Sequence, residues 1–282
     1  MKIVIDIGGT KIKFGIFTNL SSGKPEKIFT IPTLKNYELG IKEVLNVLDD
    51  LCKIDEINCI CLGLPGIIDK EKGIIIRSSN LNSWAGRSIK DLLAKRYSSE
   101  VVVEHDVVLA GLSELSCLDL LGSYLFVIWG TGFGGVLVEK NIDSEVKTTQ
   151  IEIGHQIIDG NGLQCSCGQK GCLEAYVGGG QYIKNHHQRL SDLKNDRKWD
   201  DIINKVSLGL CNSMVHLSTR NIIMDGGVIA RQTWLIDKIN KKITSILKVT
   251  DCPKISLASH LGDSAIYGGL GLIKKKLPVC SG

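Results

Sequence analysis

The chain has 282 residues, of which 43% are hydrophobic and 23% charged, and its formal net charge is +4. This composition is that of an ordinary soluble globular protein with room for two domains. The slight charge and the lack of a recognisable nucleic-acid-binding motif argue against a DNA or RNA partner. No apolar run is long enough to cross a bilayer, and the chain reaches Asp6 too early for a signal peptide. Ten cysteines in a chain of this length indicate neither a disulfide scaffold nor secretion, and seven of them are best explained as reduced thiols in a cytoplasmic protein: Cys52, Cys59, Cys61, Cys117, Cys211, Cys252 and Cys280.

The first apolar stretch, Lys2–Ile7, predicts a buried strand, and the alternation over Ile12–Phe17 predicts a second one. Between them lies the turn Gly8-Gly9-Thr10-Lys11. A dinucleotide fingerprint or a Walker P-loop would need a helix after its glycines. A Gly-Gly-Thr turn between strands can still offer backbone N–H groups and a hydroxyl to a phosphate. An ordinary hairpin turn explains this segment equally well.

The same pattern recurs farther along the chain. The strand Tyr124–Trp129 is followed by Gly130-Thr131-Gly132-Phe133-Gly134-Gly135, and Val136–Glu139 is again a strand. Two such hairpins in similar halves indicate a nucleotide held between two domains. A third apolar strand, Ile222–Met224, ends at Asp225-Gly226-Gly227, and helix formers follow it. We therefore expect this turn at the start of a helix that approaches the nucleotide.

Between the two hairpins, Cys59–Leu64 reads as a strand that runs into a turn at Gly66. The stretch Asn80–Trp84 reads as a polar loop, and Ser88–Tyr97 has helical spacing.

A candidate general base follows the next predicted strand, Val101–Val103, which ends in Glu104-His105-Asp106. An apolar helix is expected over Val107–Leu115. Carboxylates at the carboxyl ends of strands point into the crevice where α/β proteins bind ligands, which favours Asp106 as the base. The alternative is that Asp106 only caps the helix. Glu104 has the weaker claim, because alternation along the strand turns it to the opposite face.

The densest cluster of functional side chains begins at Glu152-Ile153-Gly154-His155. One histidine and three cysteines, His155, Cys165, Cys167 and Cys172, fall within eighteen residues that are rich in glycine. Four nitrogen or sulfur ligands from a tight loop are typical of tetrahedral zinc, although buried core cysteines are the alternative. Glu152 and Glu174 bracket this cluster. Zinc does not need them as ligands, so we expect both to be free to face a bound molecule.

Together these motifs resemble those of the ROK family of sugar kinases and sugar-responsive regulators, in the actin/hexokinase-like superfamily. The resemblance runs from Asp6 to Gly269 and includes Leu261–Ala265 near the end. It implies an α/β, two-domain ribonuclease H-like fold with a nucleotide and sugar cleft between the domains. The expected domains are residues 1–117 and 118–263, with a C-terminal helix over 264–282 that packs back on the first.

The resemblance also implies ATP-dependent phosphoryl transfer to a hydroxyl of a hexose or N-acetylhexosamine, of the glucose, N-acetylmannosamine or N-acetylglucosamine type, with Asp106 as the base. Structural Zn²⁺ on His155, Cys165, Cys167 and Cys172 would hold the sugar-binding loop. A cytoplasmic homodimer is expected. The implied substrate contacts are Gly66, Asn80, His105, Glu152, His155 and Glu174. The implied contacts with ATP and Mg²⁺ are Asp6, Gly8, Gly9, Thr10, Lys11, Gly130, Thr131, Gly132, Gly134, Gly226 and Gly227.

The chain departs from the family pattern in several places. His105 stands where the family usually has asparagine, which offers one acceptor and two donors where a neutral imidazole offers one of each. A contact with the sugar is therefore expected to change. Val136 and Asp225 replace usual glycines, and Asn82 stands where proline is common. A degenerate, non-catalytic sugar-binding protein is the alternative. A DNA-binding regulator would need a helix-turn-helix ahead of the hairpin at Asp6.

Overall fold

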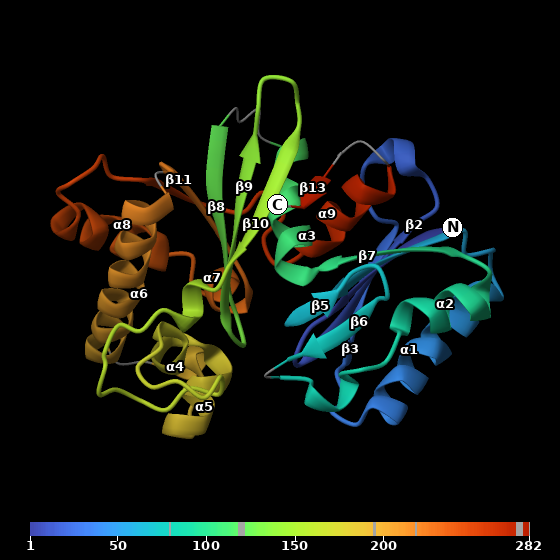
Figure 1. Ribbon diagram of the computed structural model, residues 1–282, viewed down its shortest axis with the longest axis horizontal. Helices are drawn as coiled ribbons and strands as arrows, with labels where there is room; N and C mark the ends of the chain where they lie inside the picture. Colours follow the sequence, from blue (N-terminus) through green and yellow to red (C-terminus); the bar gives the residue numbers. More distant parts are fainter. Residues whose placement is uncertain (79, 118–121, 194–195, 218, 275–278, 282) are drawn as a thin grey trace. The chain divides into compact units, whose positions relative to one another are not determined.

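The chain folds into two compact units in the computed structural model, which describes residues 1–78, 80–117, 122–193, 196–217, 219–274 and 279–281 (Figure 1). The first unit comprises Met1–Cys117 and Asp263–Pro278, and the second comprises Leu118–Gly262 and Val279–Gly282. Each unit is built on a sheet with helices, which confirms the predicted α/β class. Within the described residues, no helix combines the length and the apolarity that a membrane span requires.

A five-stranded sheet forms the centre of the first unit, in the order β3-β2-β1-β4-β7. The hairpin predicted at the start of the chain is confirmed, because β1 and β2 pair antiparallel, with Ile7 opposite Ile12. Strands β1, β4 and β7 run parallel, so their carboxyl ends meet at one edge of the sheet. The strands are β1 (Lys2–Ile7), β2 (Lys11–Phe17), β3 (Lys27–Pro32), β4 (Cys59–Leu64) and β7 (Glu100–His105).

Two helices and a small hairpin accompany the sheet of the first unit. The predicted helix is α2 (Ile89–Tyr97), capped by Ser88, and it buries Ile89 and Leu93. Longer α1 (Tyr37–Cys52) precedes β4, and β5 (Ile67–Asp69) pairs with β6 (Ile74–Arg77). The expected polar loop at 80–84 is partly a core element. Its Trp84 is fully buried, and the indole N–H donates to the Leu34 carbonyl at 3.1 Å.

Two helix boundaries differ from the sequence expectation. Helix α3 (Asp106–Leu112) ends before Leu115, since the chain tightens into a 3-10 turn in which the Ser113 hydroxyl donates to the Ala110 carbonyl. The last helix, α9 (Ser264–Ile273), packs on α3 but does not reach residue 282. Pro278 cannot continue a helix, and Val279–Ser281 pair as β13 with β10 of the second unit. Residues 275–278 and 282 of the expected helix lie outside the described residues.

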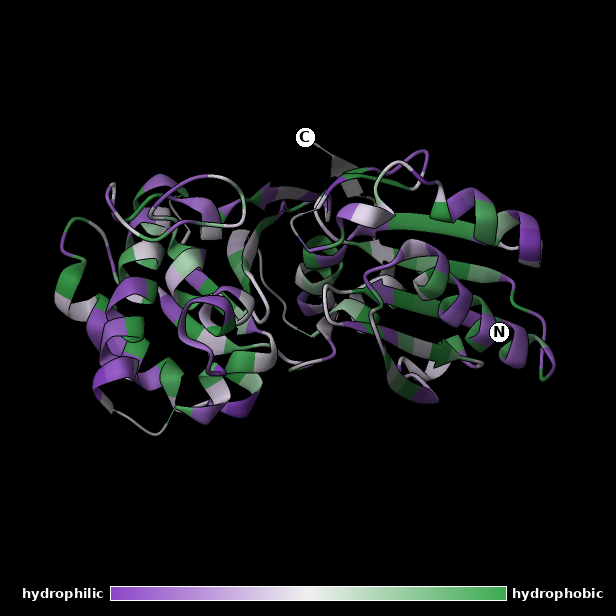
Figure 2. Ribbon diagram, turned by 90° about the horizontal axis from the view of Figure 1, so that it is seen from below, coloured by the Kyte–Doolittle hydropathy of each residue, from purple (hydrophilic) through white to green (hydrophobic). Residues whose placement is uncertain are grey.

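The second unit is built on a six-stranded sheet in the order β12-β11-β8-β9-β10-β13. Hydrophobic residues concentrate along the strands of the molecule, while the helices carry alternating hydrophobic and hydrophilic bands, as expected for helices with one face on a core (Figure 2). The strands are β8 (Gly122–Trp129), β9 (Phe133–Lys140), β10 (Val146–Ile151), β11 (Asn221–Asp225), β12 (Lys254–Leu257) and β13. The helices are α4 (Leu173–Val177), α5 (Gly179–His186), α6 (Asp196–Leu217), α7 (Gly227–Arg231) and α8 (Leu235–Ile246).

Candidate active site and metal centre

The β1–β2 turn presents polar groups at the end of its hairpin. The Gly8 N–H closes the turn on the Lys11 carbonyl at 2.9 Å, while Thr10 and Lys11 are exposed. Asp6 lies at the end of β1, partly exposed, opposite Lys13 on β2. The exposed side chains of Thr10 and Lys11 therefore stand at the end of this hairpin.

A lysine that sequence reasoning missed joins this turn to the loop that carries Asn80. The Lys35 ammonium donates to the Gly9 carbonyl at 2.6 Å and to the Asn80 carbonyl at 2.7 Å. A Cβ atom on Gly9 would lie 2.9 Å from the Asn80 Cβ atom, so the two segments are in close contact. Gly66 opens the hairpin β5–β6 at a φ of +90°, where any side chain would meet the Arg77 carbonyl. Gly9 and Asn80 thus adjoin each other in the first unit.

Asp106 is the first residue of α3, directly after the carboxyl end of β7. Its side chain is 28% exposed, and its Oδ1 atom accepts the Val107 N–H at 2.7 Å. The N-cap residue is His105, whose Nδ1 atom accepts the same Val107 N–H at 3.2 Å, so Asp106 shares this donor as the first helical residue and its carboxylate remains accessible. A carboxylate held this way has a defined orientation.

The neighbouring His105 is almost completely buried. Its side chain is 8% exposed, and its Nδ1 atom lies 2.9 Å from Asp106 Oδ1. Burial lowers the pKa of His105, but the charge and hydrogen bond of Asp106, with Glu104 and the Gly66 backbone, outweigh it and raise that pKa above its usual range. Among the described residues the buried Nε2 atom makes no hydrogen bond of ordinary geometry, so the Gly66 backbone acts on the ring only as a weaker electrostatic neighbour. This geometry directs the imidazole at Asp106 and not at solvent.

Glu104, the residue before His105 and Asp106, is also buried. It is 5% exposed, its carboxylate lies 2.7 Å from the Lys70 ammonium, and it also accepts the His105 N–H at 2.8 Å. Lys70 belongs to the turn between β5 and β6, so the ion pair anchors that hairpin to the strand that carries Asp106. Glu104 is an anchoring group here.

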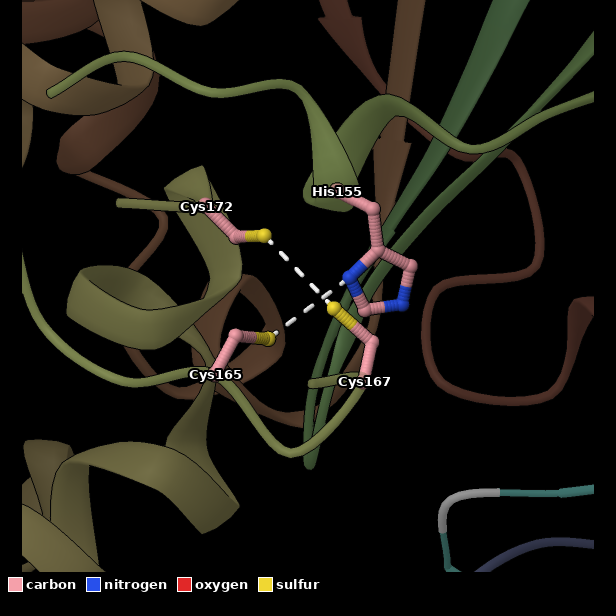
Figure 3. A group of neighbouring side chains, drawn as sticks. All are labelled: His155, Cys165, Cys167 and Cys172. Carbon is pink, nitrogen blue, oxygen red and sulfur yellow. Dashed lines mark hydrogen bonds between the residues drawn. The ribbon is translucent and has the colours of Figure 1, made fainter. Parts of the chain in front are cut away.

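The four predicted metal ligands come together in the second unit. Figure 3 shows the His155 ring and the three cysteine thiols pointing toward one another. Their donor atoms all lie within 4.8 Å of each other, with 3.7 Å between His155 Nδ1 and Cys165 Sγ and 3.7 Å between Cys167 Sγ and Cys172 Sγ. A tetrahedron with Zn–S bonds of about 2.3 Å places its donors about 3.7 Å apart. The donor set and its spacing therefore fit a Cys₃His zinc site.

The loop that carries the cluster is closed by its own backbone. Ile158 N–H donates to the Gly171 carbonyl at 2.9 Å, and Cys165 N–H donates to the Gln169 carbonyl at 2.8 Å. Gly171 has a φ of +75°, and a Cβ atom there would lie 1.6 Å from the Asp159 carbonyl, so only glycine fits. Burial, more than the neighbouring thiols, raises the pKa of Cys172 to about 12. Zinc would therefore have to displace thiol protons at neutral pH.

The two glutamates that bracket the cluster differ in their surroundings. Glu152 is exposed and accepts a hydrogen bond from the Gln150 amide at 2.8 Å. Glu174 is only 8% exposed, and its Oε2 atom accepts the Phe133 N–H at 2.8 Å. Neither glutamate belongs to the metal-ligand cluster, and one oxygen of Glu174 is already engaged by a backbone donor of the β8–β9 connection.

The second glycine turn is shorter than expected, because β9 already begins at Phe133 and takes Gly134 into the strand. The turn Gly130-Thr131-Gly132 is partly exposed, and the Gly130 N–H closes on the Gly132 carbonyl at 3.0 Å. The third turn approaches it, since a Cβ atom on Gly130 would lie 3.8 Å from the Gly227 nitrogen.

The third turn leads into α7, as the sequence predicts. Asp225, which replaces a usual glycine, is 4% exposed, and its Oδ1 atom accepts the N–H groups of Gly226 and Gly262 at 2.6 Å each. The buried carboxylate therefore fixes the backbone of this turn.

The candidate site residues fall into two groups. Asp106 and the Gly8 turn lie in the first unit, and the metal cluster and two glycine turns lie in the second.

Comparison with known proteins places these motifs in one family, since the ROK family model matches residues 2–276. The N-acetyl-D-glucosamine kinase of Vibrio parahaemolyticus is 28% identical over 96% of this chain and 98% of its own. The glucokinase of Halalkalibacterium halodurans is 26% identical, with 96% and 94% covered.

Solved structures share the fold. A ROK family glucokinase from Streptomyces griseus, in complex with glucose and AMPPNP, superposes with a TM-score of 0.80 at 19% identity, covering 97% of this chain and 99% of that one. The ROK hexokinase from Thermus thermophilus superposes with a TM-score of 0.73 at 21% identity, covering 97% and 98%.

Proposed function

The chain belongs to the ROK family, and on that premise we propose that it is an ATP-dependent sugar kinase acting on a hexose or an N-acetylhexosamine. The observation that carries this proposal is the position of Asp106. Its partly exposed carboxylate stands at the carboxyl end of a parallel strand and is oriented by a backbone N–H and an imidazole. The relatives named as N-acetyl-D-glucosamine kinase and glucokinase support the same substrate classes.

In the proposed reaction Asp106 takes the proton of the sugar hydroxyl as that oxygen bonds to the γ-phosphorus of ATP. The bond between the γ-phosphorus and the bridging oxygen breaks, and ADP leaves. Phosphoryl transfer needs positioning and electrostatic stabilisation more than covalent chemistry. Backbone N–H groups of the turn Gly8–Lys11 in the first unit, and those of the turns Gly130–Gly132 and Gly226–Gly227 in the second, are each suited to bind phosphate oxygens. Asp6 would hold Mg²⁺, which would neutralise phosphate charge.

Zn²⁺, when bound, would supply structure and no Lewis acidity, because His155, Cys165, Cys167 and Cys172 complete a four-ligand site. The cluster's loop carries Glu152 on one flank and Glu174 on the other. His155 uses Nδ1 toward the thiols, and the second ring nitrogen points away from them (Figure 3). That nitrogen is available for a sugar hydroxyl, as is the exposed Glu152 carboxylate.

Val136, one of the departures from the family pattern that motivate the non-catalytic alternative, fits the fold without disturbing the glycine turn. Val136 is fully buried in β9, where it pairs with Phe126 and Gln150, so its side chain packs in the sheet and does not fill the glycine turn. The partly exposed Asp106 also favours the kinase over a degenerate binding protein.

The test is a coupled assay of ADP formation with glucose, mannose, fructose, N-acetylglucosamine and N-acetylmannosamine. Sugar-dependent ADP formation that Asp106→Asn abolishes supports the proposal. Sugar binding by calorimetry with no ADP formation from any of the five would instead identify a binding protein.

We also propose a cytoplasmic homodimer, for which light scattering at known concentration is the direct measurement of the oligomeric state.

A further inference from the structure

The segment that follows the zinc cluster is joined to the glycine turn Gly130–Gly132. Cys172 directly precedes α4, which has only five residues, and the run Gly178-Gly179-Gly180 follows it. Four hydrogen bonds make the connection: Phe133 N–H to Glu174 Oε2 at 2.8 Å, Gly179 N–H to the Gly130 carbonyl at 2.9 Å, Gly180 N–H to the Thr131 carbonyl at 2.7 Å, and the Trp129 indole N–H to the Val177 carbonyl at 2.7 Å.

Close approach, and not backbone conformation, explains the glycines at Gly178 and Gly179. Gly178 has a φ of −66°, which any residue can adopt. A Cβ atom on Gly179, however, would lie 2.7 Å from the Gly130 carbonyl oxygen, and one on Gly178 would lie 2.7 Å from Glu174 Cγ. Gly178 and Gly179 therefore lack room for a side chain, because Glu174 and the turn occupy that space, while a Cβ atom on Gly180 would be tight at 3.1 Å from Thr131 Cγ2.

The other arm of the zinc loop reaches the same place. A Cβ atom on Gly154, the residue before His155, would lie 2.1 Å from the Phe133 carbonyl oxygen. The Phe133 carbonyl thus lies against Gly154, at the start of the loop that carries the four metal ligands. The Phe133 N–H bonds to Glu174, at the end of that loop. Zinc would cross-link these ends, since its ligands His155 and Cys172 lie beside them.

We propose that Glu174 and Gly178–Gly180 are positioning residues that couple the zinc cluster to the turn Gly130–Gly132. Zinc occupancy then controls the affinity for nucleotide phosphates, and it also orders the loop that carries the sugar contacts His155 and Glu152. The inference rests on the proposed function only in taking this turn as a phosphate site. A five-residue helix is not stable alone. Without the metal cross-link, α4 no longer holds the Glu174 carboxylate under the Phe133 N–H, and the turn loses its fixed orientation.

The binding test measures the affinity for the ATP analogue AMPPNP with Mg²⁺ by calorimetry, on zinc-loaded, zinc-stripped and zinc-restored protein. We expect stripping to weaken AMPPNP binding about tenfold, the value of roughly one lost hydrogen bond to an oriented turn, and restoration to recover it. Zinc-loaded Gly179→Ala should keep one zinc per chain, by metal analysis, and still bind AMPPNP about tenfold more weakly. Gly160→Ala, whose Cβ atom has nothing within 4 Å in the same loop, should match the wild type.

A structural measurement keeps the inference testable if AMPPNP fails to bind, which would count against the proposed function alone. Hydrogen exchange at the Phe133 amide should accelerate on zinc removal and in Glu174→Ala, while exchange in β1 and β4 of the first unit stays unchanged. Unchanged exchange at Phe133 would overturn the coupling. So would zinc-stripped protein that binds AMPPNP as tightly as the wild type while it loses only sugar affinity.

Discussion

His105 Nδ1 lies 2.9 Å from Asp106 Oδ1, so an imidazole and the proposed catalytic base share one contact at the start of α3. When Nδ1 carries a proton it donates to the carboxylate, and the Val107 N–H then bonds to Asp106 at 2.7 Å. A full positive charge on His105 stabilises the ionised carboxylate and makes it a weaker base. The base strength of Asp106 is therefore tied to the protonation of a buried neighbour.

The first prediction is a pH dependence. Burial lowers the pKa of His105, but Asp106 and Glu104 raise it above its ordinary value overall. The kcat/KM should therefore fall as pH decreases through this raised pKa, because the imidazolium weakens the base. His105→Asn should lose that titration. The measurement is kcat/KM for both proteins from about pH 5.5 to 8.5, a window around the free imidazole pKa. Superimposable profiles would assign His105 to packing alone.

Stability should respond to pH in the opposite sense. A group whose folded pKa is raised stabilises the fold below its unfolded pKa, and this contribution is lost as pH rises through the folded pKa. The Tm difference between wild type and His105→Asn should therefore be most favourable to the wild type at the acidic end and shrink toward pH 8, a value roughly above the imidazole range. Thermal unfolding of both proteins in matched buffers measures it. A difference that stays constant with pH would contradict the ion pair.

The second prediction concerns Asp106→Asn. The amide oxygen can still accept the Val107 N–H, so the start of α3 should keep its structure. Loss of the base should lower kcat by about 10² or more, while sugar binding changes by no more than several-fold. Steady-state kinetics and calorimetry with the preferred sugar check both values. A variant that retains near-wild-type kcat would reassign the role of base to another group.

The third prediction concerns the metal. Purified protein should contain about one zinc per chain, and Cys167→Ser should lower metal content and sugar affinity together, because His155 and Glu152 depend on the same loop. Cys252→Ser is the matched control, since Cys252 is an exposed free thiol outside the cluster. Metal analysis and sugar titration are the measurements. Metal-free wild-type protein with full activity would exclude the structural role.

The fourth prediction tests the packing of α9 on α3. A Cβ atom on Gly268 would lie 1.6 Å from the Leu109 carbonyl oxygen, which is backbone inside a buried helix and cannot move aside alone. Gly268→Ala should therefore destabilise the protein by about 3 kcal/mol. Gly160→Ala, which meets open space, should change the free energy of unfolding by less than about 0.5 kcal/mol. Urea unfolding of the two variants compares them, and equal stabilities would refute the close approach.

The sequence alone determined the features that depend on neighbours along the chain. Alternating apolar residues and glycine turns predicted the hairpins of β1–β2 and β8–β9, because strand periodicity is a local property. The clustering of His155, Cys165, Cys167 and Cys172 was also predictable, since all four lie in one short loop. The strand-end position of Asp106 followed from the same local pattern.

Only the tertiary structure decided which groups of distant segments meet. His105 is buried against Asp106, and Lys35 bridges Gly9 and Asn80, because strand order and loop packing bring those segments together. The run Gly178–Gly180 was visible in the sequence, but its purpose depends on a turn some fifty positions earlier that leaves no room for a side chain. The sequence marked Glu174 as a candidate ligand-facing carboxylate, and only the structure shows that it accepts the Phe133 N–H. Long-range backbone contacts of this kind leave no periodic trace in the residues that make them.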